Sequence, residues 1–128
     1  MTDDDPRNRP ASWRVLLIED ESLVAMLLED ALTVVGCRVI AIASRFEDAE
    51  QKARSLSFDV AVLDVNLNGK QTLRIAEVLF DRGIPFVFAT GYGVGFLPEH
   101  LRNVPVLQKP FQQHDLERVL HAALSPKT

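Results

Sequence analysis

Carboxylates, one hydroxyl and one ammonium group stand at or just after the ends of short apolar runs in this sequence. These groups belong to Glu19, Asp20, Asp64, Thr90 and Lys109. Clustered carboxylates repel one another, so a group of them either takes up protons or holds a cation. The sequence has no cysteine–histidine cluster with metal-ligand spacing. With oxygen ligands only, the cation we expect is a hard divalent ion such as Mg²⁺.

Asp64 has the chemistry of a phosphoryl acceptor. An aspartate beside Mg²⁺ can act as a nucleophile toward phosphorus and form an aspartyl phosphate. Such a transfer needs positioning and charge neutralisation more than covalent help. The Lys109 ammonium and the Thr90 hydroxyl are suited to stabilising the phosphoryl oxygens. Taken alone, Asp64 is better explained as the start of a turn, and it is the other strand ends that favour the phosphoryl interpretation.

The five groups converge only if the strands that precede them lie parallel in one sheet. The run 60–63 is unbroken and apolar, as in a strand covered on both faces. A turn is expected at 66–69, and the alternation of strand and helix patterns predicts an α/β doubly wound parallel sheet of five strands. Its carboxyl edge then carries all five groups. We expect strands at 15–18, 38–43, 60–64, 85–89 and 104–107, and helices at 21–35, 46–56, 71–82, 96–103 and 112–124.

Composition limits the class of protein. The chain has 128 residues, 47% of them hydrophobic and 25% charged, which predicts one packed domain over 13–125 with a flexible leader at 1–12 and a short tail at 126–128. A net charge of −4 without a basic stripe argues against nucleic acid or a membrane as a direct partner. The polar leader lacks the apolar core of a signal peptide, so we expect a cytoplasmic protein.

Four motifs resemble those of a response-regulator receiver domain, the phosphoacceptor of two-component signalling. They are VLLIEDE at 15–21, VLDV at 62–65, Thr90, and Lys109-Pro110, in the family's order and approximate spacing. The resemblance covers 14–124 and implies the flavodoxin-like strand order 2-1-3-4-5. It also implies a stand-alone signalling switch rather than a metabolic enzyme, phosphorylated by a histidine kinase or phosphotransfer protein and acting on an unknown downstream protein.

The resemblance assigns a role to each group around the acids. Asp64 matches the phosphorylated aspartate, Asp20 the direct Mg²⁺ ligand, and Glu19 its neighbour that acts largely through water. The backbone carbonyl of Asn66 matches a further metal ligand. In Lys109-Pro110 the lysine matches the residue that contacts the phosphoryl group, and the peptide bond is typically cis in the family.

A second set of positions concerns how a signal leaves the site. Thr90 matches the family's switch hydroxyl. Three residues before the lysine, the family usually has an aromatic residue, whereas this chain has Val106, whose branched side chain cannot swing in the same way. We therefore expect the change on phosphorylation to appear in 91–101, where Gly91 gives freedom to the backbone and Tyr92 can reorient.

The tetrad Phe-Ala-Thr-Gly at 88–91 resembles a smaller receiver subgroup, whose members tend to be stand-alone domains paired with a divergent class of histidine kinases. Two other functions are compatible with the pattern. One is a receiver-shaped binding module that works without phosphorylation, against which the complete set of five groups argues. The other is a flavodoxin-like binder of small ligands. The acids at 19–21 argue against it, because they would repel a cofactor phosphate.

Overall fold

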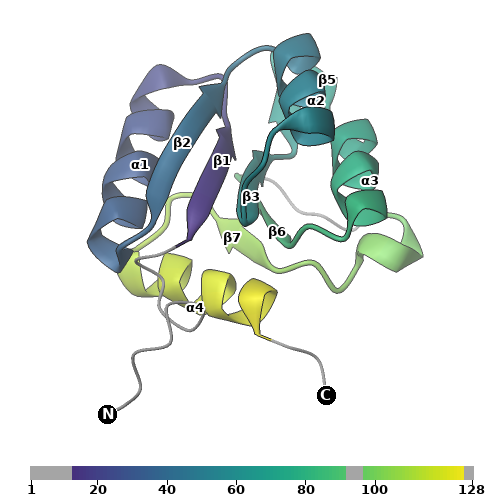
Figure 1. Cartoon of the computed structure of the whole chain (residues 1–128). Coiled ribbons are helices and arrows are strands. Elements are labelled where there is room, and N and C mark those ends of the chain that lie inside the picture. The colour runs from purple at the N-terminus through teal and green to yellow at the C-terminus, as the bar shows by residue number, and fades with distance from the viewer. Residues whose placement is uncertain (1–12, 92–96, 126–128) are drawn as a thin grey trace.

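The fold is built on one parallel sheet, shown in a computed structural model that describes residues 13–91 and 97–125 (Figure 1). The spatial order of its five strands is β2-β1-β3-β6-β7, and every neighbouring pair is parallel. In chain order this is 2-1-3-4-5, so the predicted topology is confirmed. The strands are β1 (Arg14–Ile18), β2 (Arg38–Ala43), β3 (Val60–Asp64), β6 (Phe86–Thr90) and β7 (Val106–Gln108).

Helices cover both faces of the sheet and make a three-layer molecule (Figure 1). Helices α1 and α4 pack on one face, and α2 and α3 pack on the other. Gly36 and Gly83 end α1 and α3 with φ of 105° and 71°, a left-handed conformation that favours glycine. The helices are α1 (Ser22–Val35), α2 (Phe46–Ser55), α3 (Leu73–Arg82) and α4 (Gln113–Leu124). No helix in the described part of the chain is long and apolar enough to cross a membrane.

The central strand β3 explains the unbroken apolar run in the sequence. All five of its residues are buried. Val60 and Val62 belong to the core beneath α1 and α4, whereas Ala61 and Leu63 belong to the core beneath α2 and α3. Each such valine or leucine stabilises the fold by roughly 1.5–3 kcal/mol through burial. The strand is therefore fixed from both sides, and so is the position of Asp64 at its end.

A small hairpin directly follows Asp64, where the sequence indicated only a turn. Its strands are β4 (Asn66–Leu67) and β5 (Lys70–Gln71), which pair antiparallel. The connecting residues Asn68 and Gly69 have φ of 53° and 83°. Positive φ at both central residues is the geometry of the two-residue turn that Asn-Gly favours, because it matches the twist of the flanking strands. The hairpin also makes α3 begin at Leu73, two residues later than predicted.

The last strand and the segment before it differ from the prediction as well. In place of a helix over 96–103, the described residues hold one short 3-10 turn, η3 (Glu99–Leu101). The strand expected at 104–107 is β7, at 106–108. Two local causes explain why the strand begins later than predicted. The Val104 N–H donates to the carbonyl of Leu101 in the 3-10 turn, and Pro105 has no N–H to donate to a neighbouring strand.

Candidate functional site

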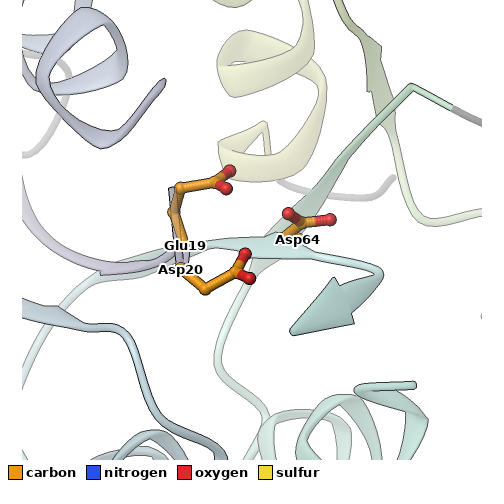
Figure 2. Close-up of side chains that lie close together, drawn as sticks. All are labelled: Glu19, Asp20 and Asp64. Carbon is orange, nitrogen blue, oxygen red and sulfur yellow. The ribbon is translucent and has the colours of Figure 1, made fainter. Parts of the chain in front are cut away.

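Three carboxylates meet at the carboxyl ends of β1 and β3. These strands pair in parallel with Ile18 opposite Leu63, so the residues that follow them are neighbours. One oxygen each from Glu19, Asp20 and Asp64 lies within 4.8 Å of the others. Figure 2 shows the three side chains close together. Glu19 and Asp64 are buried, and Asp20 is half-buried. The structure thus brings together the acids that the sequence placed at strand ends.

Lys109 closes this cluster from the loop after β7. Its Nζ lies 3.0 Å from Glu19 Oε1 and 3.3 Å from Asp64 Oδ2. Its backbone N–H donates to the carbonyl of Thr90 at 2.8 Å, which joins this loop to the end of β6. The Lys109-Pro110 peptide bond is cis, as the resemblance implies.

The cluster contains more negative than positive charge, and this affects the pKa values of its members. Burial raises the pKa of Glu19 to about 7, and the nearby charge of Asp64 adds to this, while the hydrogen bond from Lys109 opposes it. Burial alone would lower the pKa of Lys109, but its contacts with Glu19 and Asp64 outweigh that cost and raise it. Three acids face one ammonium, so a further cation would complement the site.

The donor set fits a hard divalent cation. All of the clustered side-chain ligands are carboxylate oxygens, which suit Mg²⁺ and similar ions. Asp20 is held in place by the hairpin, because its Oδ2 accepts the backbone N–H of Asn68 at 3.0 Å. Asn66 donates its backbone N–H to Asp64 Oδ1 at 3.1 Å, which places Asn66 beside the acids.

Other described residues that the sequence assigned to the site or to its switch lie at or just after the end of β6 and on β7. Thr90 is buried at the end of β6, the strand that pairs with β3, and its neighbour Ala89 lies opposite Asp64. Gly91 lines the same pocket as the acids. Val106 is half-buried on β7, opposite Phe88 rather than Thr90. Tyr92 lies outside the residues that the structure describes.

Asp20 and Asp64 line a pocket of about 930 Å³ whose lining is both charged and apolar. Lys109 adds a positive charge to it, while Val24 and Leu27 of α1 and Phe111 are apolar. The same helix, α1, exposes large apolar side chains, one of which also lines the pocket. They are Leu23 (67% exposed), Met26 (56%) and Leu27 (53%).

One residue of the site was missed at the sequence level. Thr72 is fully buried, and its hydroxyl donates to the backbone carbonyl of Asp64 at 2.6 Å. In the sequence, a threonine just before the helical pattern of 73–82 has the usual signature of a helix cap. The sequence cannot distinguish a threonine that caps the helix from one that binds the Asp64 carbonyl, because the same residue type serves both roles.

Comparison with known proteins agrees with this geometry. The family model of the response regulator receiver domain matches residues 15–121. The phyllosphere-induced regulator PhyR of Methylorubrum extorquens is 32% identical over 114 residues, 86% of this chain and 43% of that protein. A protein-glutamate methylesterase/protein-glutamine glutaminase of Archaeoglobus fulgidus is 33% identical over 69 residues, 54% of this chain and 20% of that protein. The chain thus spans less than half the length of these curated relatives.

Solved structures show the same relationship at the level of the fold. The solution structure of SdrG from Sphingomonas melonis Fr1 is similar with a TM-score of 0.78 and 39% identity, over 90% of this chain and 98% of that one. SdrG is also known in a BeF3-activated conformation, with a TM-score of 0.74 and 37% identity, over 92% and 99% of the two chains. The crystal structure of the response regulator PhyR from Brucella abortus has a TM-score of 0.76 and 27% identity, over 93% of this chain and 50% of that one. Since the family model spans most of the sequence and these folds agree with it, the chain belongs to the response regulator receiver domain family.

Proposed function

We propose that the chain is a phosphoacceptor response regulator in which Asp64 receives a phosphoryl group from a phosphohistidine. The donor is a histidine kinase or a phosphotransfer protein. One observation carries the proposal: Asp64 lines an open pocket with an ammonium 3.3 Å from its Oδ2 and two further carboxylates within 4.8 Å. A nucleophile, a cation for the transferred charge and a set of metal ligands are thus assembled at one point.

The chemical step is a transfer between nitrogen and oxygen. A carboxylate oxygen of Asp64 forms a bond to phosphorus while the phosphorus–nitrogen bond breaks, and its electron pair returns to the imidazole of the donor. The Lys109 ammonium, 3.3 Å from Asp64 Oδ2, is proposed to stabilise the phosphoryl oxygens, and the buried Thr90 is proposed to donate a hydrogen bond to them. Mg²⁺, when bound, would supply charge neutralisation for the phosphoryl group. The residues proposed to hold it are Glu19, Asp20, Asp64 and the carbonyl of Asn66.

The surface beside the pocket suits a protein donor. Val24 and Leu27 line the pocket wall, and Leu23, Met26 and Leu27 are exposed on the same helix. Exposed apolar side chains that adjoin a functional pocket mark a surface for protein contact. A donor that packs on α1 would bring its phosphohistidine to the mouth of the pocket. The relative SdrG adopts a BeF3-activated conformation, and beryllofluoride is a phosphoryl mimic, which supports a phosphorylated state for this chain too.

Signal output is proposed to occur through a change in protein–protein contacts. The alternative, a receiver-like module that binds its partner without phosphorylation, would not need Lys109 in contact with both Glu19 and Asp64. A cluster of buried charges is costly to maintain unless its members are used or well paired. We therefore favour the phosphorylated switch.

Labelling with a small phosphodonor tests the proposal. The protein is incubated with acetyl phosphate, with and without Mg²⁺, and examined by intact-mass and peptide mass spectrometry. We expect one acid-stable, base-labile phosphoryl adduct at Asp64 that depends on Mg²⁺ and is absent from Asp64→Asn. Asp81→Asn, on the solvent-exposed side of α3, is the matched control and should label normally. An adduct on another residue, or none from acetyl phosphate or phosphohistidine, refutes the proposal.

A further inference from the structure

Thr72 occupies the N-cap position of α3 without acting as the cap. It directly precedes Leu73, the first residue of the helix, and its backbone φ and ψ are −97° and 17°. A threonine at this position usually accepts a hydrogen bond from one of the first free N–H groups of its helix. Thr72 makes no side-chain cap hydrogen bond. Its hydroxyl is therefore used for something other than the helix that it precedes.

The hydroxyl is directed at the backbone of the phosphoacceptor strand. Thr72 Oγ1 lies 2.6 Å from the carbonyl oxygen of Asp64 and 3.1 Å from that of Val65. The backbone N–H of Thr72 donates to the same Val65 carbonyl at 2.9 Å. Thr72 is 0% exposed, so water does not compete for these contacts. Two consecutive carbonyls at the end of β3 are thus held by one residue eight positions along the chain.

These contacts determine which groups face the pocket. The carbonyl of Val65 points toward Thr72, and across the trans peptide bond that joins Val65 to Asn66 the carbonyl and the N–H point in opposite directions. Asn66 accordingly points its N–H away from Thr72, where Asp64 Oδ1 accepts it at 3.1 Å. In an extended residue such as Asn66 the carbonyl points to the same side as the N–H, so we expect the Asn66 carbonyl on the side of the acid cluster. Thr72 is thereby connected, through the 64–66 backbone, to both the Asp64 carboxylate and the Asn66 carbonyl.

We propose that Thr72 is a positioning residue for phosphorylation, holding the 64–66 backbone so that the Asp64 carboxylate and the Asn66 carbonyl face the cation site. This inference rests on the proposed function. It differs from a role in stability alone, because it requires that loss of the hydroxyl change metal affinity and phosphorylation rate in a protein that is still folded.

Three substitutions of Thr72 separate the hydroxyl from the methyl group. Thr72→Val keeps the shape and removes the hydroxyl, Thr72→Ser keeps the hydroxyl, and Thr72→Ala removes both. Loss of the hydrogen bond to Asp64 should lower the rate of phosphorylation by acetyl phosphate about tenfold and weaken Mg²⁺ binding severalfold. Mg²⁺ affinity is measured by calorimetric titration, which does not depend on the reaction. We expect Thr72→Ser to stay within about twofold of wild type in both measurements.

Ile75→Val is the control for stability. Ile75 is fully buried in the first turn of the same helix, and Ile→Val costs a similar loss of stability but removes none of the hydrogen bonds that hold the 64–66 backbone. We expect it to phosphorylate and bind Mg²⁺ like wild type. Should Ile75→Val show the same losses as Thr72→Val, or should Thr72→Val match wild type, the positioning role is overturned. If Thr72→Val does not fold, the difference between Thr72→Ser and Thr72→Ala decides in the same way.

The two proposals fail differently in this experiment. Wild-type protein that is never labelled at Asp64 contradicts the proposed function, whatever Thr72 does. Wild-type protein that is labelled, together with a Thr72→Val variant of equal rate and equal Mg²⁺ affinity, contradicts only the positioning role.

Discussion

Lys109→Met separates the structural role of the ammonium from its role in the reaction. In the structure, Lys109 contacts Glu19 at 3.0 Å and Asp64 at 3.3 Å, and the side-chain exposures of these three residues are 16%, 0% and 10%. Methionine preserves the length and the apolar stem of lysine but removes its charge. The acid cluster then loses its ammonium, so in the folded state without metal the buried acids either carry uncompensated charge or take up a proton, and both outcomes cost stability at neutral pH.

The magnitude follows from the burial of the ion pairs. Removing one partner of a buried pair costs about 3–5 kcal/mol. Because Lys109 keeps some exposure at the pocket, we expect the lower end, about 3 kcal/mol, in the absence of Mg²⁺. Mg²⁺ should offset part of this loss. Two unit charges about 4 Å apart interact by about 1 kcal/mol even in water, so an ammonium at that distance disfavours a divalent ion by about 2 kcal/mol, and its removal should tighten the binding of the ion about 30-fold. At the same saturating concentration, Mg²⁺ then stabilises the variant by about 2 kcal/mol more than it stabilises wild type.

Urea denaturation in EDTA and in saturating Mg²⁺ measures both quantities, and acetyl phosphate labelling measures the reaction. We expect Lys109→Met to lose stability in EDTA, to gain more from Mg²⁺ than wild type, and still to phosphorylate slowly. Lys70→Met is the matched control, since Lys70 is exposed and its contact with Glu47 is 3.5 Å long, so its stability should change by less than about 0.5 kcal/mol. A Lys109→Met variant as stable as wild type in EDTA, or one that Mg²⁺ stabilises no more than wild type, would refute the reasoning.

Three further outcomes can be measured with the same protein. In calorimetric titrations, Asp20→Ala should weaken Mg²⁺ binding far more than Glu19→Ala, because Glu19 is already engaged by the ammonium of the site, and equal losses would contradict the assignment of Asp20 as the direct ligand. Burial would raise the pKa of Asp59, but hydrogen bonds from Arg14 outweigh it and hold the pKa below its ordinary value. The ionised Asp59 therefore stabilises the fold at pH values above the pKa that it has in the unfolded chain, and this stabilisation disappears as the pH falls. Asp59→Asn should lower the free energy of unfolding by about 1 kcal/mol at pH 7 and by progressively less below about pH 3.9. A loss of stability that does not change with pH in urea melts would contradict this. Relaxation-dispersion NMR with and without beryllofluoride should show exchange in 91–101 that activation quenches, and identical profiles in the two states would argue against a change there.

The sheet and the acid cluster were predictable because buried parallel strands leave a strong signal. An unbroken apolar run such as 60–63 has few alternatives to a strand covered on both faces, and the residue after it falls on the carboxyl edge. Asp64 and Glu19 are adjacent for that reason alone, since β1 and β3 are paired. The chemistry of the cluster then depends only on residue types, which the sequence states directly.

Features set by only a few contacts could not be predicted in the same way. The hairpin after Asp64 depends on two pairs of residues and an Asn-Gly turn, which in the sequence indicates a turn but not the pairing around it. The backbone contact of Asn68 with Asp20 involves an N–H that every residue except proline possesses. Such contacts are specified by the fold as a whole and leave no local pattern.

The position of Val106 limits how a change at Thr90 can travel. Val106 lies opposite Phe88 and packs in the core beneath α2 and α3, together with Leu101. Its branched side chain has few accessible rotamers, so it cannot exchange places with a moving hydroxyl. Thr90, however, accepts the backbone N–H of Lys109 at 2.8 Å. A displacement of the Thr90 backbone toward Asp64 must therefore carry the Lys109 backbone with it or break that hydrogen bond. For this reason we expect the coupling to run through the backbone at the ends of β6 and β7 rather than through an aromatic side chain.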